Sequence, residues 1–218
     1  MELDHIFICV DDDGRGADAL AALGLTEGAP NAHPGQGTAN RRFFFRNSFI
    51  ELLHLVDESE AQSQLTAPTQ LFERFKCADG VAAPFGVCFR PSTAGEKPAF
   101  PAWEYRPVYL PPALKVDVGY APVSEPMWFF LSFARRPDEA PIERAQPLEH
   151  ANGFRDMTSV RVTTPYSQAF SSPANCANQL QGFDIAHGDE HLVVLGIDHG
   201  ASGQTHDLRP GLPMIINW

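Results

Sequence analysis

The residues of this chain best suited to chemistry are a histidine and a glutamate, His5 and Glu51. Imidazole and carboxylate together bind divalent transition metals such as Zn, Fe(II), Mn, Ni or Co. Without a metal, the same pair can act as a general base if burial moves its pKa toward neutrality. The alternative interpretation is that the two side chains only hydrogen-bond each other or a ligand.

Two strands are expected to carry this pair. Residues 2–10 alternate with period two, which places His5 on the same face as Phe7 and Cys9. Residues 48–56 predict a second strand, on which Glu51 shares a face with Phe49 and Leu53. Between them we expect a short helix over 17–23 that stops at Gly24, a short strand with a polar turn, and a strand over 41–46.

The polar turn is the most distinctive motif of the chain. Residues 33–41 read His-Pro-Gly-Gln-Gly-Thr-Ala-Asn-Arg, in which the glycines permit tight curvature. Donors and acceptors for a ligand would come from His33, Gln36, Thr38 and Asn40. A capped turn that orders the following strand is the alternative, and both interpretations can hold together.

The turn resembles the H-x-G-x-G-T-x-N pattern of glyoxalase-like domain proteins. The order strand, helix and three strands, with histidine first and glutamate last, is similar to the βαβββ unit of the vicinal oxygen chelate superfamily. The resemblance implies an α+β fold in which repeated βαβββ modules form a cupped mixed β-sheet. It also implies a metal held by His5 and Glu51 with ligands from matching strands of a partner module. Members of the superfamily isomerise, epimerise, cleave C–C bonds with oxygen, or open epoxides.

The partner ligands expected from this resemblance are missing. Matching strands of the middle block offer Cys88 or Val87 and residues 128–130, and those of the C-terminal block offer Ser159 and residues 193–194. None of these is a His/Glu pair, so a complete metal site would need a ligand from a loop.

We predict one compact domain over residues 1–218 with three modules. They cover residues 1–57, 84–134 and 150–218, the second without its helix and the third partial. A further helix is expected over 67–76. Trp128 and Phe130 of the middle block are expected to line an apolar cavity, with core packing as the alternative. Arg90 would pair with a ligand carboxylate or with Glu104, and Asp4 would brace its neighbour.

The composition limits the classes of partner. Sixteen basic against twenty-seven acidic residues give a net charge of −11, which argues against nucleic acid or an anionic membrane. The cysteines lack CxxC spacing and predict free thiols in a cytoplasmic protein; they are Cys9, Cys77, Cys88 and Cys176. We expect no signal peptide, and no apolar run approaches the ~20 residues that span a bilayer. A homodimer is left open.

The sequence therefore predicts a small-molecule enzyme of lyase, isomerase or dioxygenase type, with His5 and Glu51 as catalytic residues. A divalent metal, Fe, Mn, Ni or Zn, is its expected cofactor. The alternative is a non-catalytic protein that binds or sequesters a small organic molecule in the same cup. The chain contains no P-loop, no GxSxG elbow and no H-E-x-x-H motif, so nucleotide hydrolysis, serine hydrolysis and zincin chemistry are disfavoured.

Overall fold

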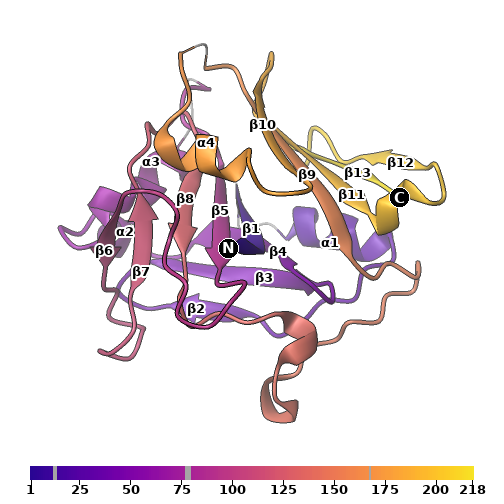
Figure 1. Ribbon diagram of the computed structural model, residues 1–218, viewed down its shortest axis with the longest axis horizontal. Helices are drawn as coiled ribbons and strands as arrows, with labels where there is room; N and C mark the ends of the chain where they lie inside the picture. The colour runs from indigo at the N-terminus through magenta and orange to yellow at the C-terminus, as the bar shows by residue number, and fades with distance from the viewer. Residues whose placement is uncertain (12–13, 77–79, 167) are drawn as a thin grey trace.

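The structure is a computed structural model that describes residues 1–11, 14–76, 80–166 and 168–218 (Figure 1). Cys77 lies outside the described residues. An eight-stranded mixed sheet has the order β2-β3-β4-β1-β5-β8-β7-β6. Its strands are β1 (Glu2–Val10), β2 (Asn31–His33), β3 (Thr38–Phe44), β4 (Phe49–Leu55), β5 (Phe85–Arg90), β6 (Ala102–Tyr105), β7 (Val116–Gly119) and β8 (Met127–Phe130).

The two halves of this sheet repeat one arrangement. In the first half β1 lies parallel to β4, and in the second half β5 lies parallel to β8. Antiparallel pairing of β1 with β5 joins the halves. Helix α1 (Arg15–Ala22) follows β1, whereas a loop follows β5, so the second half has the strand order of a βαβββ unit without its helix.

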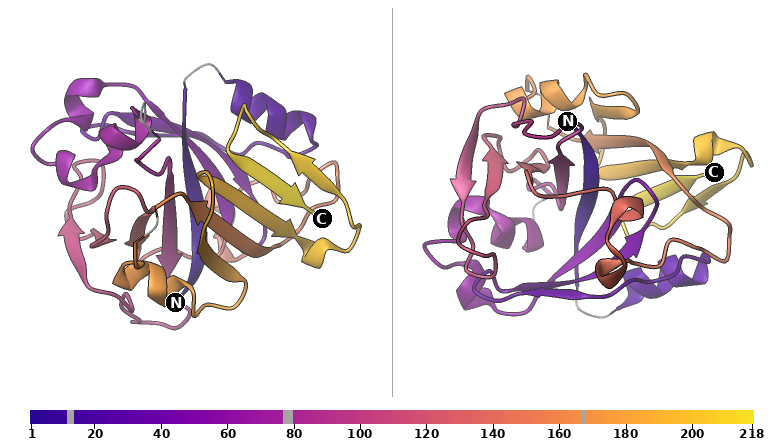
Figure 2. Two further views of the ribbon diagram at one scale, coloured as in Figure 1. Left: turned by 90° about the horizontal axis from the view of Figure 1, so that it is seen from above. Right: turned by 60° about the horizontal axis from the view of Figure 1, so that its bottom comes forward.

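A second sheet of five strands has the order β10-β9-β11-β13-β12 and lies to one side in the orange-to-yellow part of the chain (Figure 2). In this sheet β9 pairs in parallel with β10, the strand directly after helix α4 (Ser172–Ala177). In the first sheet β1 pairs in parallel with β4, which is the third strand after helix α1. The strands are β9 (Met157–Thr164), β10 (Phe183–His187), β11 (Leu192–Ile197), β12 (Thr205–Asp207) and β13 (Met214–Asn217).

Alternation along the strands gives the eight-stranded sheet two different faces. One face packs against the second sheet and forms the main core, with Ile6, Ile50 and Trp128 in it. The other face is concave and carries a smaller core that includes Phe7, Cys88 and Phe129. The site described below lies on this concave face.

The remaining helices are short. They are α2 (Glu58–Ala61), α3 (Leu71–Phe75) and the 3-10 turns η1 (Ala67–Thr69), η2 (Pro137–Glu139), η3 (Ile142–Arg144) and η4 (Asp198–Gly200). The helix expected over 67–76 is thus divided into η1 and α3, because Gln70 between them has a φ of 57° in the left-handed region. Among the described residues no helix is long and apolar enough to cross a bilayer.

The α+β class and the curled mixed sheet predicted from the sequence are confirmed. The prediction of one compact domain over residues 1–218, made of three modules, stays a prediction.

Candidate functional site

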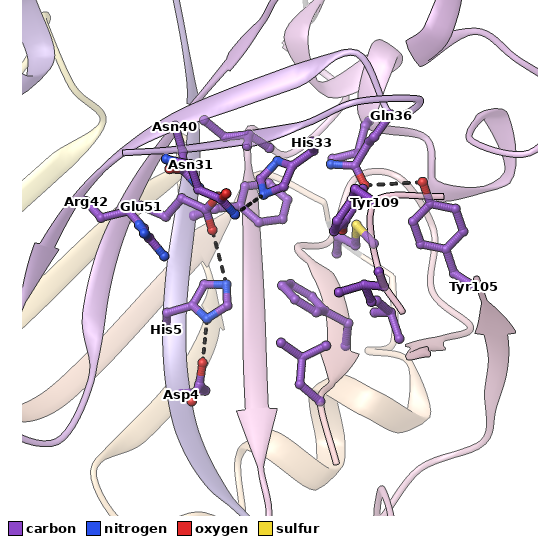
Figure 3. Close-up of a pocket in the computed structure, with 18 of the residues that line it drawn as sticks. Asp4, His5, Asn31, His33, Gln36, Asn40, Arg42, Glu51, Tyr105 and Tyr109 are labelled. Atoms are coloured by element: carbon purple, nitrogen blue, oxygen red, sulfur yellow. Dashed lines mark hydrogen bonds and ion pairs between the residues drawn. The ribbon is translucent and has the colours of Figure 1, made fainter. Parts of the chain in front are cut away.

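A pocket of about 260 Å³ opens on the concave face of the eight-stranded sheet (Figure 3). One wall is polar and comes from the first half of the sheet and β2; it contains Asp4, His5, Asn31, His33, Gln36, Asn40, Arg42 and Glu51. The opposite wall is mostly apolar; it contains Tyr105, Tyr109, Leu110, Val116, Met127, Phe129, Leu131 and Phe133. The pocket therefore suits a small molecule with one polar side and one apolar side.

His5 is fixed at both ring nitrogens. Its Nδ1 lies 2.7 Å from Asp4 Oδ2, and its Nε2 lies 3.2 Å from Glu51 Oε2 (Figure 3). The His5 ring stacks on Phe49 with centroids 4.3 Å apart, and Phe129 contacts it edge-on at 5.5 Å. The side chains of His5 and Glu51 are only 7% and 9% exposed, so this pair holds its geometry away from bulk water.

Asp4 reaches the same side as His5 because of a β-bulge. The register of β1 against β5 shifts between Leu3 and His5, so Asp4 is the extra residue of the bulge. Strict alternation would turn neighbouring side chains to opposite faces, and bulges commonly re-aim a side chain beside a functional site. The expectation that Asp4 braces its neighbour agrees with this contact.

The Asp4 carboxylate is held in turn by Arg90, which is buried at the end of β5. Arg90 Nη1 lies 3.1 Å from Asp4 Oδ1, and its Nε donates to Glu2 Oε1 at 2.9 Å. The pairing with Glu104 expected from the sequence is absent, because Glu104 pairs with Arg106 and Lys115 on the exposed edge formed by β6 and β7.

The electrostatics favour a charged pair at neutral pH. Burial raises the pKa of Glu51, but its hydrogen bond with His5, the charge of His5 and the amide of Asn40 outweigh burial and lower it to about 2. Burial lowers the pKa of His5, while Cys88, Asp4 and Glu51 raise it well above its usual value. Because burial also raises the pKa of Cys88 to about 12, the carboxylates are the anions that hold the imidazolium.

General-base action by this pair was conditional on burial that moves its pKa toward neutrality, and in the resting site the two pKa values are instead moved apart. Two carboxylates flank one imidazole instead, so His5 is the proton donor and Glu51 is ionised.

The polar turn forms a hydrogen-bond network at the pocket rim. Thr38 Oγ1 lies 3.0 Å from His33 Nδ1 and accepts from Gln36 Nε2 at 2.8 Å. Burial lowers the pKa of His33. Its Nε2 lies 3.3 Å from the amide nitrogen of Asn31, which can only donate, so the neutral ring carries its proton on Nδ1 and donates it to Thr38 Oγ1. Tyr105 and Tyr109 donate to Gln36 Oε1 at 3.2 and 3.4 Å. This network gives the turn the ordering role that the sequence offers as the alternative to ligand contact.

The four turn residues differ in their access to the pocket. His33, Gln36 and Asn40 line it, whereas Thr38 does not and is almost fully buried. Asn40 donates to Glu51 Oε1 at 2.6 Å, so this amide contacts the central pair directly.

Trp128 and Phe130 do not line the pocket. Both are completely buried on the opposite face of β8, within the core between the two sheets. The expectation that they contact a ligand is corrected by the parity of β8, which turns Met127 and Phe129 into the cup.

Several pocket residues were not proposed as site residues from the sequence. Arg42 lies directly opposite Glu51 in the β3–β4 pairing, and the register of that pair is a signal that could have found it. Tyr109 comes from the loop between β6 and β7, and no periodicity in the sequence indicates that this loop returns to His33.

Residues 3–99 match the glyoxalase-like domain family. This stretch is a glyoxalase-like domain. The resemblance inferred from the sequence is thereby confirmed over that range.

Solved structures extend the similarity of fold. A hypothetical protein from Staphylococcus aureus covers 99% of this chain and 98% of its own, with a TM-score of 0.54 and 11% identity. A hypothetical protein from Bacillus halodurans covers 62% of this chain and 96% of its own, at 17% identity and a TM-score of 0.44. The similarity to the Staphylococcus aureus protein is one of fold alone. No curated protein matches the chain.

The glyoxalase-like fold implies a metal, and the donor chemistry of the site can be tested against it. Ligand atoms of Asp4, His5 and Cys88 lie within 4.8 Å of one another, a group of oxygen, nitrogen and sulfur donors. Glu51 lies on the other ring nitrogen of His5. These donor types fit a divalent transition metal. Arg90 already occupies one oxygen of Asp4, which favours an orienting role for that carboxylate.

Proposed function

We propose that the chain is a small-molecule enzyme of the glyoxalase-like kind, of lyase, isomerase or dioxygenase type, acting through His5 and Glu51. The single observation that supports this best is the fixation of His5 by a carboxylate at each ring nitrogen, with both side chains largely buried at the wall of a pocket. A buried imidazolium between two carboxylates is costly for a purely structural element, because each charge is desolvated. Perturbed pKa values in a cleft are typical of active sites.

His5, Glu51 and the two residues that hold His5 in place each have a definite part in this proposal. Asp4 fixes the orientation of the His5 ring through Nδ1, and Arg90 fixes Asp4. Nε2 then donates its proton to a substrate oxygen that enters between His5 and Glu51. Loss of that proton removes the charge that keeps Glu51 a weak base, so Glu51 becomes able to accept a proton from the adjacent carbon or hydroxyl.

A divalent metal fits the same pair. His5 Nε2 and Glu51 would hold it, and Asp4 would orient the imidazole from the opposite nitrogen. When bound, such a metal acts as a Lewis acid toward vicinal oxygens of a substrate. Because the Nε2 proton must leave before a metal binds, metal affinity is expected to rise with pH.

The test combines metal content with turnover. Purified, tag-free protein is compared with the double variant His5→Ala/Glu51→Ala and with His33→Ala, a pocket histidine that does not contact Glu51. Near-stoichiometric metal after reconstitution with Fe(II), Mn, Ni or Zn, retained in His33→Ala and lost in the double variant, supports the metal site. Screens of diols, hydroxyketones and catechols then test turnover. The absence of both bound metal and turnover would overturn the proposal.

The second candidate is a binding protein without catalysis. The observation that favours it is the apolar wall, where the second half of the sheet supplies Phe129 and Leu131 instead of further ligands. Glu51→Gln separates the two candidates. An enzyme loses turnover while retaining affinity for its ligand, whereas a binding protein shows no turnover in either form.

A further inference from the structure

Arg42 is the pocket residue that the proposed function leaves without a role. It lies on β3 directly opposite Glu51, on the concave face of the sheet. Its Nε donates to Ala29 O at 2.9 Å, and its guanidinium carbon lies 5.2 Å from the centre of the Phe44 ring. These two contacts hold the group at the pocket margin (Figure 3).

The terminal nitrogens of Arg42 have no partner among the residues that the structure describes. The neighbouring Arg41 is different, because it forms a bidentate salt bridge with Glu27. No described carboxylate lies within 4 Å of Arg42, although Glu51 is its cross-strand neighbour. The reason is that Glu51 turns toward His5 and Asn40, as its contacts show.

The charges around the pocket leave Arg42 uncompensated. Asp4 is paired with Arg90, and Glu51 is paired with His5, so these four groups balance. Arg42 then adds one positive charge to a pocket within a chain whose net charge is −11. Partial burial lowers the pKa of Arg42, with Glu51 opposing, which indicates a cation that is incompletely solvated. An anion in the pocket would relieve this cost.

We propose that Arg42 binds the carboxylate of a small organic acid whose apolar body packs against Phe129 and Leu131. A planar guanidinium with free terminal nitrogens matches a carboxylate through two parallel hydrogen bonds. The inference rests on the proposed function in one respect, since an oxygen on the carbon next to the carboxylate would meet His5. The substrate class is therefore a 2-hydroxy or 2-oxo acid with an apolar substituent.

The test uses mandelate and mandelamide, which differ in charge but share a hydroxyl and a phenyl ring. Isothermal titration measures both dissociation constants for the wild type, Arg42→Gln, Arg42→Lys and the control Arg46→Gln. Arg46 lies just beyond β3 and outside this pocket. We expect wild type and Arg46→Gln to prefer mandelate at least tenfold, with a preference that weakens as salt is added.

In Arg42→Gln the preference should vanish while mandelamide binds as in the wild type. Arg42→Lys should give an intermediate preference, because a lysine keeps the charge but cannot form the two parallel hydrogen bonds of a guanidinium. Absence of a preference in the wild type, or its survival in Arg42→Gln, would overturn the inference. Tighter binding of phenyl phosphate than of mandelate would overturn the carboxylate assignment. Unchanged unfolding temperatures exclude misfolding as the cause of any loss.

Failure of this inference can be distinguished from failure of the proposed function. If the chain binds no metal and turns over no substrate but keeps an Arg42-dependent preference for mandelate, the function fails and the inference stands. If metal binds through His5 and Glu51 but mandelate and mandelamide bind alike, the inference fails alone.

Discussion

In the first half of the eight-stranded sheet, the central residue of β1 that faces the pocket is His5, and its direct partner on β5 in the second half is Cys88. Each of them pairs with a phenylalanine on the last strand of its own half, His5 with Phe49 and Cys88 with Phe129. Both phenylalanines contact the His5 ring. The two halves thus place equivalent positions around one point.

The halves differ at the next inward position. Two residues beyond Phe49 stands Glu51, whereas two residues beyond Phe129 stands Leu131, whose amide continues the pairing with β5. The first half therefore supplies the charged wall and the second half supplies the apolar wall. In the proposed function the second half, which offers no ligand equivalent to Glu51, contacts the apolar side of the bound molecule, and the predictions below test this difference between the halves.

The largest effect is expected where the second half supports the first. Arg90→Leu would leave Asp4 buried without its guanidinium partner and Asn47 O without its donor. Breaking a buried pair costs about 3–5 kcal/mol of unfolding free energy, as urea denaturation would measure. The control Arg106→Leu removes an exposed pair with Glu104 and should cost less than about 1 kcal/mol. Equal losses would show that Asp4 does not depend on the second half.

Acid should weaken the first half through Glu51. Its pKa is about 2 in the folded chain, below the value near 4.3 of an unfolded glutamate, so its contribution is complete above pH ~4.3 and is lost as the pH falls toward 2. The loss amounts to roughly 3 kcal/mol. In Glu51→Gln the free energy of unfolding should vary less over this window than in the wild type. The matched variant Glu143→Gln, at an exposed glutamate, should keep the wild-type profile. Identical profiles for all three proteins would contradict the prediction.

The first half was predictable because its signals are local. Period-two alternation placed His5 and Glu51 on inward faces, and the Gly-rich turn with its neighbouring strands carried the family resemblance. Alternation could not reveal the bulge at Asp4, because a bulge breaks the very period from which faces are inferred.

The second half was less predictable for a related reason. The strand at residues 127–130 is apolar at every position, and a run without alternation does not show which face is inward. The sequence therefore predicts Trp128 and Phe130 in the cup, where the structure places Phe129. Arg90 and Arg42 depend on partners brought together by sheet pairing, which no single strand contains.

Restoring a ligand to the second half should strengthen metal binding. Leu131→Glu places a carboxylate at the position that mirrors Glu51, and a further ligand should lower the dissociation constant for Co(II) about tenfold, or roughly 1.4 kcal/mol. Leu110→Glu adds the same charge from the loop between β6 and β7 and serves as the control. Titration with Co(II), followed by its visible absorption, measures both. If the control gains as much affinity, charge alone and not the mirrored position is responsible.

The smallest predicted effect compares the two phenylalanines that flank His5. Phe49 stacks on the imidazole at 4.3 Å and 19°, while Phe129 meets it edge-on at 5.5 Å and 73°. Double-mutant cycles with His5→Gln should therefore give a coupling free energy of about 0.5–1 kcal/mol with Phe49→Leu and a smaller value with Phe129→Leu. Urea denaturation of the single and double variants at pH 7 measures both cycles. The reverse order would mean that the apolar half, and not the half that carries Glu51, sets the position of the imidazole ring.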